Sequence, residues 1–191
     1  ADLRPGLWSL RRSAYSGERD VIVIGDARAL PFRSQSVDLV VTSPPYWGQR
    51  DYGIKSQIGL EESPSLYVEQ LSLVCRDVFR VLKDHGTLWL NIADTYFGDS
   101  PVRVSGRESF SKEWDSTQTR SRGGKRRSAA SVDGVVAKSL SCIPNRVMQS
   151  LAADGWIVRS QIVWHKPNTR PEGRVKDRPI RSYEVIVMCS K

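Results

Sequence analysis

Val37-Asp-Leu-Val-Val-Thr-Ser-Pro-Pro-Tyr-Trp47 is the stretch that decides the fold. Its first half is a run of β-branched and aliphatic residues, which predicts a buried strand. The two prolines that follow end this strand and hold the next residues in a fixed turn. Ligands of open α/β sheets bind at the carboxyl ends of strands. The turn after the strand is therefore a candidate site.

Outside this stretch, strands and helices alternate along the chain. The first predicted helix begins at Ser63-Pro64 and stops at Gly86, and the second begins at Ile143-Pro144. Further strands are predicted at 20–25, 87–93, 156–164 and 183–188. The alternation predicts an α/β fold with a mostly parallel sheet. No helix separates the last two strands, so they are expected to form an antiparallel edge pair.

Composition excludes several classes of protein. The chain has 191 residues, of which 39% are hydrophobic, enough for one domain with a real core. No apolar run approaches the roughly 20 residues of a membrane helix, and the first residues have no apolar signal core. We therefore expect a cytoplasmic, nucleoid-associated protein without a membrane partner. Three widely spaced cysteines and two histidines predict neither a metal site nor a disulfide scaffold.

The net charge of +8 is concentrated in two segments. Residues 103–127 carry eight basic and three acidic side chains, and residues 159–181 carry seven and two. A near-neutral body with two basic segments indicates a polyanion-binding surface. The alternative for each segment alone is a solvated loop. Residues 98–135 are rich in Ser, Gly and Arg, and we expect a basic, flexible insert there that faces DNA.

The Ser-Pro-Pro-Tyr turn suits a flat heterocycle that carries an exocyclic amine. The ring of Tyr46 would stack on the heterocycle, while Ser43 Oγ and the Pro44 carbonyl would accept the two amine hydrogens. The alternative reading of the turn alone is a loop stiffened by proline with a packed aromatic ring.

Several separated motifs resemble those of the amino-methylating DNA methyltransferases, which modify N4 of cytosine or N6 of adenine. Thr42 to Trp47 is similar to their catalytic motif. Later segments resemble further motifs in the same order: 51–53, 57–61, 79–83, 86–90, 155–156, 162–168, 176–179 and 182–184. The resemblance covers residues 20–191 apart from the basic insert. It implies a Rossmann-like methyltransferase sheet that binds S-adenosylmethionine.

The resemblance also implies a mechanism and a target. Ser43, Pro44, Pro45 and Tyr46 would form the catalytic pocket of a site-specific enzyme of a restriction-modification system. The target base would flip out of duplex DNA, and its amine would attack the sulfonium methyl directly. Family members with serine at the first position mostly modify cytosine N4, which makes N6 of adenine the alternative.

Further roles are carried over from the resemblance. The cofactor is expected near Asp26, Thr42 and Asp94, although a turn-capping role for Asp26 is the alternative. The residues expected to contact DNA are Trp47, Arg120, Arg122, Lys125, Arg126, Arg127, Lys166, Asn168 and Arg178. Packing is the alternative for Trp164, and an ion pair with Asp177 is the alternative for Arg178.

One family feature is missing, namely the Phe-x-Gly-x-Gly turn that lets the backbone approach the cofactor. Residues 1–19 are interpreted as an N-terminal arm and 20–191 as a partial catalytic domain. A fragment, one half of a split enzyme that needs a second polypeptide, and a degenerate relative remain as explanations. The competing functions are a non-catalytic DNA-binding module and methylation of RNA or of a protein amide. Monomer and homodimer both stay open.

Overall fold

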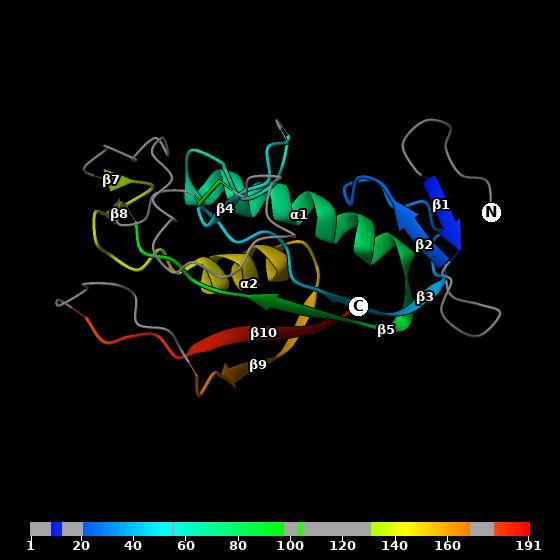
Figure 1. The fold of residues 1–191 in the computed structure, drawn as a ribbon. Coiled ribbons are helices and arrows are strands. Elements are labelled where there is room, and N and C mark those ends of the chain that lie inside the picture. The colour runs from blue at the N-terminus through cyan, green and yellow to red at the C-terminus, as the bar shows by residue number, and fades with distance from the viewer. Residues whose placement is uncertain (1–8, 13–20, 55, 98–102, 105–130, 169–177) are drawn as a thin grey trace.

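A four-stranded sheet with two helices on one of its faces forms the body of the protein (Figure 1). The structure is a computed structural model, and it describes residues 9–12, 21–54, 56–97, 103–104, 131–168 and 178–191. Among these residues, no helix is long and apolar enough to cross a membrane.

The strands of the sheet are ordered β3-β5-β10-β9. They are β3 (Val37–Thr42), β5 (Leu82–Ile92), β10 (Tyr183–Ser190) and β9 (Ile157–His165). β3 is parallel to β5, whereas β10 is antiparallel to both β5 and β9. The antiparallel pair at the edge is thereby confirmed. The same order places the ends of β3, β5 and β9 and the start of β10 at one edge of the sheet.

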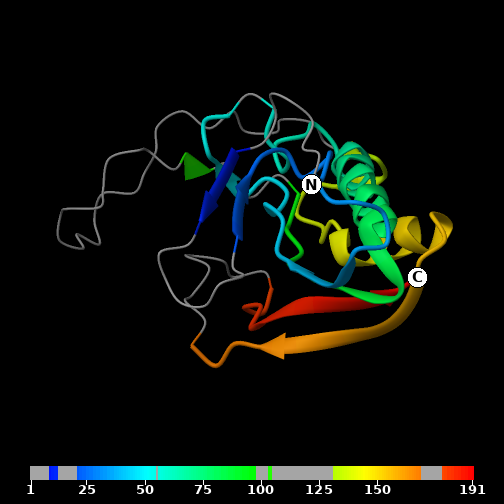
Figure 2. The same ribbon diagram turned by 90° about the vertical axis from the view of Figure 1, so that its right-hand side faces the viewer.

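The strand predicted at 20–25 forms, but it lies outside this sheet. As β2 (Val21–Ile24) it pairs antiparallel with β1 (Ser9–Arg12), which falls in the predicted N-terminal arm. Figure 2 shows the pair apart from the four-stranded sheet. Parallel pairing is therefore less frequent than expected, with one parallel and two antiparallel neighbours in the described sheet. A strand pattern reveals an extended segment but not its partner.

Helix α1 (Pro64–Val81) begins as predicted. Ser63 is its N-cap, and its side chain accepts a hydrogen bond of 3.2 Å from the backbone N–H of Leu66. The helix ends earlier than Gly86, because Leu82 already has extended backbone and starts β5.

Gly86 has a different role from the predicted helix stop. It lies inside β5, and a Cβ atom there would come within 2.9 Å of Leu82 Cδ2 and of the Lys83 carbonyl oxygen. The carbonyl oxygen of Asp38, on β3, would lie 3.2 Å away. Glycine is needed here because the neighbouring backbone approaches closely.

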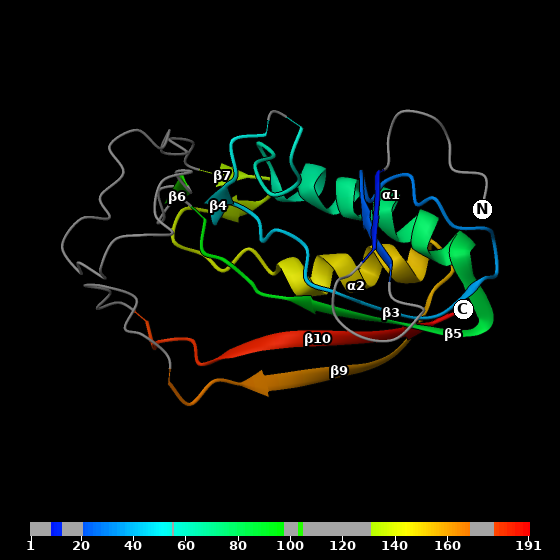
Figure 3. The same cartoon turned by 45° about the vertical axis from the view of Figure 1, so that its right-hand side comes forward.

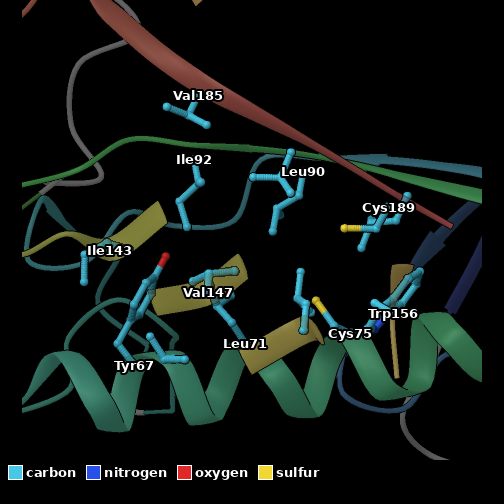
Figure 4. Packing of buried hydrophobic residues seen from close by; sticks show 14 of the residues in the cluster. Tyr67, Leu71, Cys75, Leu90, Ile92, Ile143, Val147, Trp156, Val185 and Cys189 are labelled. Carbon is cyan, nitrogen blue, oxygen red and sulfur yellow. The ribbon is translucent and has the colours of Figure 1, made fainter. Parts of the chain in front are cut away.

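The core lies between the sheet and the two helices. In Figure 3, helix α2 (Ile143–Ala153) lies below α1, and both helices are on the same side of the sheet. Figure 4 shows the apolar side chains of both helices meeting those of β5 and β10. Burial raises the pKa of the Cys75 thiol to about 12 and that of Cys189 to about 11. Both behave as core thiols, whereas Cys142 is exposed.

Two short strand pairs complete the described structure. β4 (Arg50–Asp51) is parallel to β6 (Arg103–Val104), and β7 (Ser131–Val132) is antiparallel to β8 (Val135–Val136). The predicted insert at 98–135 is described only where β6 and the β7–β8 pair fall.

Candidate active site

The Ser-Pro-Pro-Tyr corner follows directly on β3, at the edge where β5 and β9 end and β10 begins. This topology brings three further side chains to Tyr46: Asn91 from β5, Glu184 from β10 and Lys166 from just beyond β9. Four segments far apart in the chain thus supply one polar cluster.

The Tyr46 hydroxyl is at the centre of this cluster. It donates a hydrogen bond of 2.9 Å to Glu184 Oε2. It lies 3.2 Å from Asn91 Nδ2 and 3.2 Å from Ser43 Oγ, both of which donate to it. Asn91 Nδ2 also donates to Glu184 Oε2 at 3.0 Å. The four side chains therefore form one continuous hydrogen-bond network.

Glu184 carries the negative charge of the network. Burial alone would raise the pKa of its carboxyl group, but hydrogen bonds from Lys166, Asn91 and Tyr46 outweigh this effect and lower it. The ammonium group of Lys166 pairs with Glu184 Oε1 and also lies 5.0 Å from the centroid of the Trp164 ring. Glu184 is thus an ionised carboxylate at neutral pH.

Tyr46 keeps its proton under the same conditions. Burial, followed by the hydrogen bond to Glu184 and the charge of Glu184, raises the pKa of its hydroxyl to about 12, although the hydrogen bond from Ser43 opposes the shift. Ser43 itself is exposed. A neutral tyrosine thus connects an ionised carboxylate to a serine hydroxyl that a ligand can reach.

Contacts from α1 and from Gly59 fix the backbone of the corner. The hydroxyl of the fully buried Tyr67, on α1, donates a hydrogen bond of 2.9 Å to the Pro45 carbonyl oxygen. Gly59 packs closely on the same residue, since a Cβ there would lie 3.2 Å from Pro45 Cβ, and its φ of +107° favours glycine. These contacts restrain the backbone of the corner in addition to the two prolines.

Trp47, which was expected to contact DNA, has its side chain in the interior of this structure. Its side chain is 0% exposed and stacks on Phe97, with ring centroids 6.3 Å apart. The indole N–H donates to the Glu61 carbonyl oxygen at 3.0 Å. The residue after the corner is therefore part of the core, and it anchors the turn.

Two predicted cofactor ligands are engaged within the chain. Both carboxylate oxygens of Asp26 accept hydrogen bonds from Arg28, at 2.6 Å for the Nη2–Oδ2 contact, and this partner lowers the pKa of Asp26. Asp26 follows β2, so it does not extend from the four-stranded sheet.

Asp94 has a capping role that the sequence did not reveal. Its Oδ1 accepts from the backbone N–H of Ile143 at 3.0 Å, at the start of α2, and from Thr95 at 2.8 Å. Burial raises the pKa of Asp94, although these backbone donors oppose the shift. Thr42 is the last residue of β3, next to the corner. Cofactor contacts of all three residues stay predictions.

The candidate DNA contacts separate into three groups. Lys166 pairs with Glu184 beside Tyr46, and the side chain of Asn168, two residues later, is exposed. The Cζ atom of Arg178 lies 3.7 Å from the centroid of the Tyr96 ring, which is a cation–π contact. The five remaining residues lie outside the described part of the chain: Arg120, Arg122, Lys125, Arg126 and Arg127.

Sequence reasoning missed the two side chains that organise Tyr46, namely Asn91 and Glu184. Asn91 stands between Leu90 and Ile92 in β5, and Glu184 comes directly before Val185 in β10, and a half-buried polar side chain beside aliphatic neighbours is an informative signal. That pattern could have marked both as site residues, but it could not have shown that they meet.

Family and structural comparisons agree with this architecture. The N6_N4_Mtase family model, described as DNA methylase, matches residues 37–191. The chain therefore belongs to this family of DNA methylases. This family assignment agrees with the amino-methyltransferase motifs identified in the sequence.

Particular relatives can be named. The chain is 42% identical over 172 residues to the Type II methyltransferase M.SmaI of Serratia marcescens, covering 89% of this chain and 55% of the relative. It is 43% identical over 190 residues to M.XycI of Xanthomonas campestris pv. cyanopsidis, covering 99% and 58%. The chain thus spans little more than half the length of these relatives.

Solved structures share the fold. The PvuII DNA methyltransferase, which is cytosine-N4-specific, superimposes with a TM-score of 0.56 at 21% identity, over 87% of this chain and 47% of that one. A putative DNA modification methylase from Thermus thermophilus, solved in complex with S-adenosyl-L-methionine, gives a TM-score of 0.51 at 25% identity, over 88% and 54%.

Proposed function

We propose that the protein to which this chain belongs methylates the N4 amino group of cytosine in duplex DNA, with S-adenosylmethionine as methyl donor. One observation carries the proposal. The Ser43 hydroxyl is exposed at a rigid corner, and its hydrogen is given to Tyr46, so that its lone pairs are free to accept a hydrogen bond. An exocyclic amine is the group on a base that donates such a bond.

The chain's own residues bind and orient the base. Ser43 Oγ and the Pro44 carbonyl accept the two amine hydrogens, and the Tyr46 ring provides a stacking face for a base that has left the duplex. These hydrogen bonds draw the N–H electrons away from hydrogen and favour a pyramidal, more nucleophilic nitrogen. Fixed dipoles and fixed geometry supply the rate enhancement.

Two of the three candidate cofactor residues already have partners within the chain. Asp26 has both carboxylate oxygens bound to Arg28, and Asp94 caps α2 through one oxygen. Thr42, beside the corner, remains the best placed of the three candidates. When bound, the cofactor supplies an electrophilic methyl group.

Cytosine is favoured over adenine because the first residue of the corner is serine, and the motif resemblance implies that family members with serine at this position mostly modify cytosine N4. The substrate class rests on the family and on the two basic segments, whose side chains would neutralise backbone phosphates with a steep dependence on salt.

The test is a methylation assay with the protein in its full natural length. Duplex DNA is incubated with S-adenosylmethionine carrying a labelled methyl group and is digested to nucleosides. We expect labelled N4-methylcytosine. Substitution Ser43→Ala should reduce the single-turnover rate by about 100-fold or more, by removal of a preorganised polar contact. Ser34→Ala, at another exposed serine, serves as the matched control and should leave the rate unchanged.

Each other outcome has a defined meaning. Labelled N6-methyladenine would overturn the assignment to cytosine. Preferential labelling of competitor RNA or of protein would overturn the substrate class. A Ser43→Ala variant with undiminished turnover would remove the corner from the chemistry, and tight DNA binding without any methylation would favour a non-catalytic DNA-binding module.

A further inference from the structure

All hydrogen-bonding positions of the Tyr46 hydroxyl are occupied. A phenol has one hydrogen to donate and two lone pairs that accept. The hydrogen goes to Glu184 Oε2 at 2.9 Å. The lone pairs face Asn91 Nδ2 and Ser43 Oγ, each at 3.2 Å.

The directions of these bonds are forced by the chemistry of the partners. A carboxylate only accepts, and Glu184 is ionised because Lys166 pairs with it. An amide nitrogen only donates, and Asn91 Nδ2 faces both Glu184 Oε2 and the Tyr46 hydroxyl. The one remaining position on Tyr46 is an accepting lone pair. Ser43 must therefore use its single hydrogen to donate to Tyr46.

We infer that Glu184 is a positioning residue that acts through Tyr46 to make Ser43 an obligate hydrogen-bond acceptor toward the substrate, and that it thereby selects an amine over a carbonyl group. The inference rests on the proposed function and deepens it. With its hydrogen committed, Ser43 offers only lone pairs to a base. The C4 amine of cytosine donates to them, whereas the O4 atom of uracil is itself an acceptor.

The energetic basis of the selection is an unpaired acceptor. A carbonyl that faced Ser43 would leave two acceptors opposite each other without a hydrogen between them. A site built to pair with a donor rejects an analogue that lacks it, because buried polar groups are then left unsatisfied. The charge of Glu184 strengthens the effect, since hydrogen bonds in a chain polarise one another.

Two substitutions release the Ser43 hydroxyl. In Glu184→Gln the amide can donate to Tyr46, so the donor and acceptor roles along the hydrogen-bond network are no longer fixed. In Tyr46→Phe the ring remains for stacking, but the acceptor that holds the Ser43 hydrogen is gone. In both variants Ser43 can rotate and donate to a carbonyl oxygen. Glu69→Gln, an exposed glutamate on α1, is the matched control.

The experiment measures binding, in the absence of a methyl donor. The methylated site is first located by sequencing DNA that the protein has modified. Two duplexes then carry either cytosine or uracil at the target position, opposite guanine. The ratio of their dissociation constants is determined for the full-length protein and its variants. Differences in base-pair strength between the duplexes are the same for every variant, so they cancel when the ratios are compared.

The expected result is a change in this ratio toward uracil by about tenfold in Glu184→Gln and in Tyr46→Phe, which corresponds to the free energy of about one hydrogen bond. Because Glu184 acts through Tyr46, the double variant should match Tyr46→Phe alone rather than show the product of both effects. The Glu69→Gln ratio should equal that of the wild type. Thermal unfolding of each variant confirms that it is folded.

Two results would overturn the inference: an unchanged ratio in both variants, or fully independent effects in the double variant. The proposed function fails in a separate way. If Ser43→Ala methylates DNA as fast as the wild type, the corner does not hold the base at all. If Ser43→Ala is inactive while Glu184→Gln leaves the ratio of the cytosine and uracil dissociation constants unchanged, only the positioning role of Glu184 is refuted.

Discussion

The Tyr46 hydroxyl donates a hydrogen bond of 2.9 Å to Glu184 Oε2, although the two residues are 138 positions apart in the sequence. The antiparallel pairing of β10 with β5 brings the start of one strand to the end of the other. A side chain from the last strand thus fixes a ring in the turn after β3. The orientation of the candidate catalytic tyrosine is set by sheet topology.

The pH dependence of folding stability should report the charge of Glu184. Its pKa is lowered in the folded protein from an ordinary value of 4.5, so its contribution is present above that value and is lost as the pH falls through the folded pKa. We expect the difference in unfolding free energy between wild type and Glu184→Gln to be largest at neutral pH. Urea unfolding at a series of pH values from neutral downward measures it.

Glu69→Gln provides the reference for that series, because the side chain is exposed on α1. Its difference from the wild type should stay small throughout. A difference for Glu184→Gln that does not shrink on acidification would show that Glu184 gains no stabilisation from its ionised form.

Trp47 should behave as a core residue. Substitution Trp47→Ala removes a fully buried side chain that stacks on Phe97, and we expect a loss of about 3–5 kcal/mol in unfolding free energy. Trp164→Ala is the contrasting variant, since that side chain is 48% exposed, and it should cost about 1 kcal/mol or less. Urea unfolding distinguishes the two, and equal losses would contradict the placement of Trp47 in the core.

Asp94 should stabilise α2 as a cap. Asp94→Ala removes the acceptor for the Ile143 N–H, with an expected loss of about 1 kcal/mol. Asp94→Asn keeps an acceptor oxygen and removes the buried charge. The folded-state pKa of Asp94 is raised above its ordinary 3.8, so the stability that its protonated form contributes is present at low pH and is lost as the pH rises through the folded pKa.

The wild type should therefore lose stability relative to Asp94→Asn between acidic and neutral pH, as measured by urea unfolding. An opposite trend, with the wild type gaining on Asp94→Asn as the pH rises, would mean that the backbone donors outweigh burial.

Gly86 should tolerate no side chain. In Gly86→Ala the new Cβ would lie 2.9 Å from the Lys83 carbonyl oxygen and 3.2 Å from that of Asp38, so the backbone of β3 or β5 has to shift. We expect a loss of about 1–3 kcal/mol in thermal or urea unfolding. Asp84→Ala, at an exposed position two residues earlier, should stay within about 0.5 kcal/mol of the wild type. Equal effects at the two positions would contradict the close approach.

Local signals predicted the local structure well. Ser63-Pro64 marks the start of α1, and the two prolines after Thr42 mark a rigid turn at the end of β3. These features depend on neighbouring residues alone, through capping and restricted backbone angles. The same kind of local signal misled at Gly86, because a glycine that ends a helix and a glycine that admits a close backbone look alike in sequence.

The candidate site was only half predictable. The corner itself could be found from its residue types, but the contacts of Asn91 and Glu184 with Tyr46 could not, and Trp47 was expected to contact DNA although it is buried. Each of these facts depends on which segments lie side by side in space.

The amino-acid sequence alone determined β3, the turn after it, the starts of the two helices and the chemical character of the corner. Each of these features is governed by contacts within a few residues. Folding in three dimensions settled which strand lies beside which, that β2 stays outside the sheet, and that a carboxylate from β10 directs the hydrogen of Ser43 through Tyr46. The physical reason is that strand pairing and charge placement depend on long-range contacts, and many registers and partners are compatible with the same local pattern.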